Sequence, residues 1–171
     1  MAKNEKKDIL HIVLSGAAWL IFAVCLVRFF VAYGSLPEEI GIHFSGSGGF
    51  DVIDRKIFGL YPFAVSLITL LLCALFCRLA KRLKAGKNVS PKGEIIMRKA
   101  IILFVDLVQL LWVAFFSGIW SDCVIRQEPL NTTFPYILML IIFGLFAVLI
   151  ILLVTVSLVY RVKKDNENKD K

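Results

Sequence analysis

The chain has 171 residues, 58% of which are hydrophobic, and its mean hydropathy is +0.79. Such apolar content is rare in a soluble domain of this length, so the composition excludes an ordinary soluble globular protein. The formal net charge is +7, but the basic residues lie in short segments beside apolar runs. Membrane insertion and anionic lipid explain that placement, and nucleic acid is not expected as a partner.

Four long apolar runs follow one another along the chain, over residues 9–33, 57–79, 100–120 and 135–160. Each has about 20 residues or more, enough to cross a hydrocarbon core about 30 Å thick. In lipid a spanning segment must satisfy its own backbone hydrogen bonds, so each run is predicted to be an α-helix. The predicted fold class is an all-α membrane protein, a four-transmembrane-helix bundle whose first partner is the lipid bilayer.

The basic residues predict the orientation of this bundle. The connections 34–56 and 121–134 carry only Arg55, Lys56 and Arg126. Most of the other basic residues lie in the N-terminal tail, the second connection and the C-terminal tail: Lys3, Lys6, Lys7, Arg78, Lys81, Arg82, Lys84, Lys87, Lys92, Arg98, Lys99, Arg161, Lys163, Lys164, Lys169 and Lys171. The positive-inside rule then predicts a cell membrane protein with both termini in the cytoplasm and an ordered extracellular loop between the first two helices.

The chain divides into a cytoplasmic tail (1–8), a unit of two spans and the outer loop (9–80), a basic cytoplasmic loop (81–99), the third and fourth helices (100–162), and a charged cytoplasmic tail (163–171). Ser90 and Pro91 fit a helix N-cap followed by proline, so the third helix is expected to begin before its membrane segment. The tail 163–171 is expected to be frayed and solvated. The basic loop is interpreted mainly as a topology signal, and docking of a cytoplasmic regulator is the alternative.

Ionisable residues inside a span are costly and are therefore candidates for function. His11 is interpreted as an interfacial polar residue, with a proton relay as the alternative. Arg28 is expected to snorkel outward and meet an acidic residue of the outer loop, which anchors that loop. The candidate partners of Arg28 are Glu38, Glu39, Asp51 and Asp54.

Asp106 lies about 10 Å inside the cytoplasmic end of the third helix, by helical rise. Gln109 and Ser117 fall on the same face of that helix, and the face must look into the bundle because lipid would not solvate it. Ser15 and Thr155 are expected at a similar depth as hydroxyl partners. Hydrogen bonding between helices is the preferred interpretation, and a proton or ligand site is the alternative.

The four cysteines are Cys25, Cys73, Cys77 and Cys123, and the sequence shows no zinc-knuckle, redox or disulfide spacing among them. We interpret all four as packing residues or idle thiols.

The outer loop has an ordered pattern of its own. Leu36 and Pro37 leave the first helix as an extended dipeptide. Ile40 and Phe44 belong to a short alternating segment that predicts extended structure. A glycine-rich stretch over 46–49 then predicts a tight turn.

The residues of this pattern are spaced as Leu-Pro, then Ile-x-x-His-Phe, then Gly, Asp and Lys, then Pro in the next span. They are Leu36, Pro37, Ile40, His43, Phe44, Gly48, Asp51, Lys56 and Pro62. Residues 9–80 thereby resemble the bacterial membrane domain of unknown function shared with the N-terminal part of SdpI-like immunity proteins, which protect their producer from a secreted sporulation-delaying toxin. The departures are Gly41 where proline is usual, Ser45 where asparagine is usual, and Ile53-Asp54 where Trp-Gly is common.

Within the loop, His43 and Asp51 are expected to hydrogen-bond, and Lys56 to pair with a carboxylate or a lipid headgroup. A divalent metal held by His43, Asp51 and Glu38 or Glu39 is the alternative, although the ligand spacing is not tight. We expect neither a metal nor a cofactor. A folded cap over the outer mouth of the bundle is the expected result.

Two functions remain open at this stage. The resemblance implies a non-enzymatic protein of immunity or envelope-stress signalling that engages an extracellular peptide toxin through the outer loop. The alternative is a small proton-coupled transporter or channel component that uses Asp106, for which a homo-oligomer is expected. An enzyme is not expected, because the sequence has no Ser-His-Asp set, no HExxH motif and no phosphate-binding glycine loop.

Overall fold

The structure is a computed structural model that describes residues 9–82 and 89–169, with side chains described as far as Arg161. The tail 1–8 and residues 83–88 of the basic loop lie outside the described residues. Among the described residues, four helical segments are long and apolar enough to cross a membrane: Ile9–Tyr33, Lys56–Arg82, Pro91–Arg126 and Thr133–Arg161. The prediction of a multi-pass helical membrane protein is confirmed.

The first span is the single helix α1 (Ile9–Tyr33), with the predicted bounds. The second span consists of a 3-10 turn (Lys56–Leu60) and α2 (Tyr61–Arg82). The third consists of α3 (Pro91–Val113), a π-helix (Ala114–Trp120) and α4 (Ser121–Arg126). The fourth lies in α5 (Thr133–Lys169). Ser90 caps α3 as predicted, because its side chain accepts a hydrogen bond from the Gly93 backbone N–H at 3.3 Å. The expectation of a frayed tail is wrong as far as Lys169, because α5 continues through it as helix.

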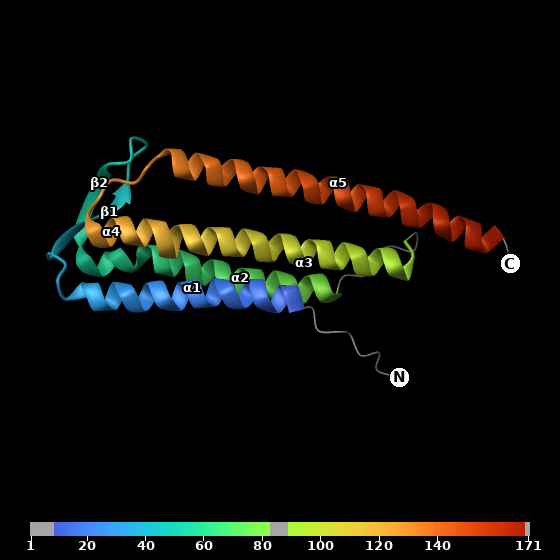
Figure 1. Ribbon diagram of the computed structural model, residues 1–171, viewed down its shortest axis with the longest axis horizontal. Helices are drawn as coiled ribbons and strands as arrows, with labels where there is room; N and C mark the ends of the chain where they lie inside the picture. Colours follow the sequence, from blue (N-terminus) through green and yellow to red (C-terminus); the bar gives the residue numbers. More distant parts are fainter. Residues whose placement is uncertain (1–8, 83–88, 170–171) are drawn as a thin grey trace.

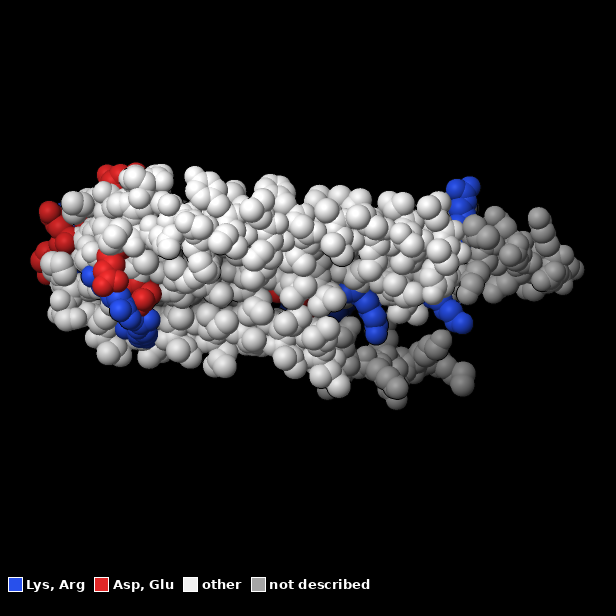
Figure 2. Space-filling view, turned by 45° about the horizontal axis from the view of Figure 1, so that its top comes forward, with Lys and Arg blue, Asp and Glu red and all other residues white. Residues whose placement is uncertain are grey.

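Helix α3 is the centre of the bundle. It contacts α1, α2 and α5, and α1, α2 and α3 lie side by side (Figure 1). Most of the surface of α5 is exposed, and most of its large apolar side chains face outward. In Figure 2, a broad band of uncharged side chains separates a charged end at the left from Lys and Arg at the right. Such a band is what lipid requires of a spanning bundle.

The loop between the first two spans is a β-hairpin rather than a single extended segment. Strands β1 (Glu39–Phe44) and β2 (Phe50–Arg55) pair antiparallel, with Ile40 opposite Asp54. The predicted extended segment corresponds to β1, whereas β2 was not predicted. The predicted tight turn joins them, and Gly48 adopts a φ of 89° there, which favours glycine.

The hairpin is packed onto the end of the bundle. Leu36, Ile40 and Phe44 join a buried apolar cluster whose other members come from all four spans and from the connection before α5: Phe29, Phe63, Phe115, Val124, Leu130 and Leu138. Burial of apolar area at about 25 cal/mol per Å² is the force that holds such an element in place. We call the hairpin with its turn, residues 39–55, the cap.

Candidate functional site

The backbone of the cap is held by hydrogen bonds to the last residue of the π-helix, to the residue that ends α4 and to the connection that follows. Gln127 accepts a hydrogen bond from the Gly41 N–H at 2.8 Å and donates to the Gly41 carbonyl at 3.5 Å. The Trp120 indole N–H donates to the Ile42 carbonyl at 3.4 Å, and the Leu130 N–H donates to the Gly48 carbonyl at 2.8 Å. The side-chain amide of Gln127 therefore covers the outer edge of β1 as a neighbouring strand would.

Gln127 was not singled out from the sequence, and its local conformation explains its reach. It ends α4 with a φ of 55°, in the left-handed region that non-glycine residues rarely adopt. Its side chain then turns back toward the cap, and it also donates to the Val124 carbonyl at 2.6 Å. A glutamine just after a helix carries no sequence signal for such a contact.

The motif residues divide into two groups. Leu36, Ile40, Phe44, Gly48 and Pro62 are buried, so they support the cap and the start of α2. A Cβ added at Gly48 would lie 2.2 Å from the Leu130 carbonyl oxygen, which requires glycine at this position in addition to the positive φ.

The second group consists of Pro37, His43, Asp51 and Lys56, which lie at the surface of the cap or directly beside it. His43 Nδ1 lies 2.7 Å from an Asp51 carboxylate oxygen, and Lys56 Nζ lies 2.9 Å from a Glu38 carboxylate oxygen. Both predicted pairings are present. The His43 and Asp51 side chains are 53% and 43% exposed, and such surface pairs contribute about 1 kcal/mol or less to stability. The fold therefore depends little on His43 and Asp51, and both are open to a partner.

The two edges of the cap differ. Gln127 covers β1, whereas β2 pairs only with β1 within the described part of the chain. Two apolar side chains of β2, Val52 and Ile53, are exposed, Ile53 to 68%. An unpaired strand edge with exposed apolar side chains is a template for another strand.

Arg28 does not meet the outer loop as expected. Its guanidinium forms an ion pair with Asp122 of α4, which Arg126 also contacts at 3.1 Å. The prediction was wrong because the third span continues through a π-helix into α4, which places Asp122 beside α1. Arg28 thus ties the first span to the third at the cap end.

The predicted polar face of the third span is confirmed. Asp106, Gln109 and Ser117 are all buried. Ser117 donates to the Ser66 hydroxyl of α2 at 2.7 Å, and Ser66 donates to the Pro62 carbonyl at 2.9 Å. This chain of hydroxyls joins α2 to the π-helix inside the bundle.

Asp106 has a different partner from those predicted. His11 Nδ1 lies 2.9 and 3.0 Å from the two carboxylate oxygens of Asp106, and Thr155 instead donates to the Ile151 carbonyl of its own helix. His11, interpreted as an interfacial polar residue, therefore has a buried partner that was not predicted. The helix ends are staggered, so His11, near the start of α1, reaches the depth of Asp106.

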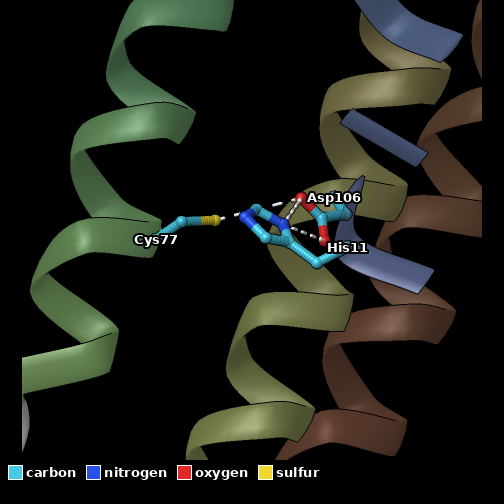
Figure 3. A group of neighbouring side chains, drawn as sticks. All are labelled: His11, Cys77 and Asp106. Carbon is cyan, nitrogen blue, oxygen red and sulfur yellow. Dashed lines mark hydrogen bonds and ion pairs between the residues drawn. The ribbon is translucent and has the colours of Figure 1, made fainter. Parts of the chain in front are cut away.

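Cys77 of α2 completes this group (Figure 3). Its sulfur lies 3.9 Å from Asp106 Oδ1, and Cys77 is buried. The interpretation of Cys77 as a packing residue missed this contact, because its spacing to Cys73 gave no sign of a partner on α3. Three helices thus each contribute one polar side chain to a single point inside the bundle.

A cavity of about 370 Å³ opens beside this point. Its lining includes His11, Asp106 and Lys99, and the rest is apolar, including Leu10, Ile102 and Leu152. Lys99 lies two helical turns before Asp106, toward the start of α3. Two members of the group, His11 and Asp106, therefore line a cavity that the exposed Lys99 also lines.

Comparisons of the chain with family models, curated proteins and solved structures found no match.

Proposed function

We propose that the protein lies in a bacterial cell membrane with its cap outside and both termini in the cytoplasm. The support is the distribution of charge along the bundle. The end opposite the cap carries Lys81, Arg82, Lys92, Lys99 and Arg161 at or near the helix ends. The cap end has more acidic than basic residues: Glu38, Glu39, Asp51, Asp54, Asp122 and Glu128 against Arg28, Arg55, Lys56 and Arg126. The positive-inside rule favours this orientation.

The cap acts as a recognition surface for a secreted peptide, and the protein is non-enzymatic. The observation that carries this proposal is the outer edge of β2, which has no paired strand among the described residues and exposes Val52 and Ile53. An extended peptide adds to such an edge through main-chain hydrogen bonds, and side-chain pockets give specificity. The acidic excess at the cap end favours a cationic peptide.

A catalytic role for the cap is disfavoured by its hydrogen bonds. His43 pairs with Asp51, as a general base would with an orienting carboxylate. The nearby hydroxyl of Ser45 is engaged with Ser47 and with the Gly49 carbonyl instead. Because the Ser45 hydroxyl is engaged elsewhere, the His43–Asp51 pair is left as a charged, exposed contact for a ligand.

Recognition of a secreted peptide by the cap agrees with the resemblance to SdpI-like immunity proteins. Capture of a secreted toxin peptide at the cap protects the cell that carries the protein, because the bound peptide cannot enter the bilayer. Rigid attachment of the cap through Gln127, Trp120 and Leu130 reduces the entropy that binding would otherwise cost.

The test is survival of a strain that is killed by a secreted sporulation-delaying toxin peptide. Expression of the chain should restore growth, and Ile53→Lys should abolish protection, because a lysine on an edge strand opposes strand addition and repels a cationic peptide. Ile53→Val is the matched control and should protect. Because Ile53 is exposed, both variants should keep the unfolding temperature of the parent chain. Equal protection by Ile53→Lys, or none by the parent chain, would refute the proposal.

A second function, a small transporter or channel component that uses Asp106, is favoured by the burial of that carboxylate between three helices. The two functions differ in which residues they need. Protection should depend on His43 or Asp51 and tolerate Asp106→Asn, whereas ion flux into proteoliposomes should depend on Asp106 and tolerate changes in the cap.

A further inference from the structure

We propose that His11, Cys77 and Asp106 form a three-ligand site inside the bundle for a borderline-soft divalent cation of the Zn²⁺ or Co²⁺ type. The three residues come from α1, α2 and α3 and point toward one another (Figure 3). One possible ligand atom from each lies within 4.8 Å of the other two. This site is separate from the cap, and the inference does not depend on the function proposed for the cap.

The separations suit a tetrahedral ion. Zn²⁺ bonds of about 2.0–2.3 Å place neighbouring ligand atoms of a tetrahedron about 3.3–3.8 Å apart. Here the His11 nitrogen is 2.9 Å from Asp106 Oδ2, and the Cys77 sulfur is 3.9 Å from Asp106 Oδ1. Side-chain movements of less than about 1 Å would bring both distances into that range, with no change in the helices.

The chemistry of the three side chains selects the class of ion. Imidazole nitrogen and thiolate sulfur bind borderline and soft metals, whereas Ca²⁺ and Mg²⁺ require oxygen ligands. On binding, the Cys77 thiol loses its proton to solvent and becomes a thiolate. A thiolate, a carboxylate and a neutral imidazole then balance the two positive charges of the ion. A neutral complex is far easier to hold at this depth than a lone carboxylate.

Three protein ligands leave the fourth position of a tetrahedral ion open, and the cavity lies beside the site. Catalytic zinc sites keep a fourth position for water or a substrate, while structural sites are closed by four protein ligands. His11 and Asp106 line the cavity of about 370 Å³, so the fourth position faces it. Lys99 lines the same cavity, where its ammonium group would attract an anionic ligand.

The test uses the full-length chain in lipid nanodiscs, stripped of metal with a chelator and then titrated with Co²⁺. Bound to a thiolate, Co²⁺ gives a sulfur-to-metal charge-transfer band in the near ultraviolet. The parent chain should show this band with one Co²⁺ per chain, and Zn²⁺ should displace it. Cys77→Ser should lose the band, whereas a variant with serine at Cys25, Cys73 and Cys123 should keep it.

Loss of even an outer-shell partner of a metal typically costs about 10–100-fold in affinity, so loss of a ligand should cost about 100-fold or more. His11→Ala keeps the thiol and tests this expectation independently, should Cys77→Ser fail to fold. Absence of the band from the parent chain, an undiminished band in Cys77→Ser, or unchanged Co²⁺ affinity in His11→Ala would each overturn the proposal.

Discussion

The turn of the cap allows a sharp test of how the cap is held. Gly48 adopts a φ of 89°, and an added Cβ would lie 2.2 Å from the Leu130 carbonyl oxygen. Gly48→Ala therefore places an L-residue in a left-handed conformation, at roughly 1–2 kcal/mol, and adds a steric overlap of about 1–3 kcal/mol. The expected total of about 2–5 kcal/mol is large compared with the stability of one surface element, so the turn should detach from the connection before α5.

Hydrogen exchange of the cap and of the Leu130 amide measures this detachment, since exchange reports the free energy of local opening. A cost of 2 kcal/mol corresponds to about a 30-fold increase in exchange through the open state. Gly46→Ala is the matched control, because an added Cβ there meets nothing within 4 Å. If Gly48→Ala exchanges no faster than Gly46→Ala, the described contact between the turn and the connection is not what holds the cap.

Two further substitutions test the packing inside the bundle. Gly93→Leu should lower the unfolding temperature in detergent by separating α3 from α5, because a Cβ at Gly93 would already lie 2.9 Å from Tyr160 Cβ. Gly144→Leu should not, because a Cβ at Gly144 would meet nothing within 4 Å. Ser66→Ala removes the acceptor of the buried Ser117 hydroxyl and should cost about 1–3 kcal/mol in denaturant unfolding. A cost below about 0.5 kcal/mol would show that Ser117 does not depend on Ser66.

The helical spans could be predicted because hydropathy is a local property of the sequence. The bounds of the first helix, residues 9–33, were predicted correctly, and the N-cap residue Ser90 with Pro91 predicted the start of α3. The polar face of the third span followed from helical period alone, since lipid forces Asp106, Gln109 and Ser117 inward. The alternation of Ile40 and Phe44 likewise indicated one strand of the hairpin.

The partners of these residues could not be predicted, because partners depend on how the helices are staggered. Counting residues from the membrane edge placed His11 at the interface, away from Asp106, and the sequence offered only residues of the outer loop as partners for Arg28. The group around Cys77 has one residue on each of three helices, so no spacing within a single segment reveals it. Strand β2 carries Asp51, Asp54 and Arg55, which oppose a strand prediction, and the structure stabilises it by pairing.

Recognition at the cap requires first of all that the cap lie outside the cell, and a protease added to intact cells tests this directly. A cleavage site inserted after Gly46, in the exposed turn, should be cut in intact cells. A tag fused after Lys171 should remain whole until the cells are lysed. Cleavage of that tag in intact cells, with the inserted site protected, would reverse the orientation and contradict the account.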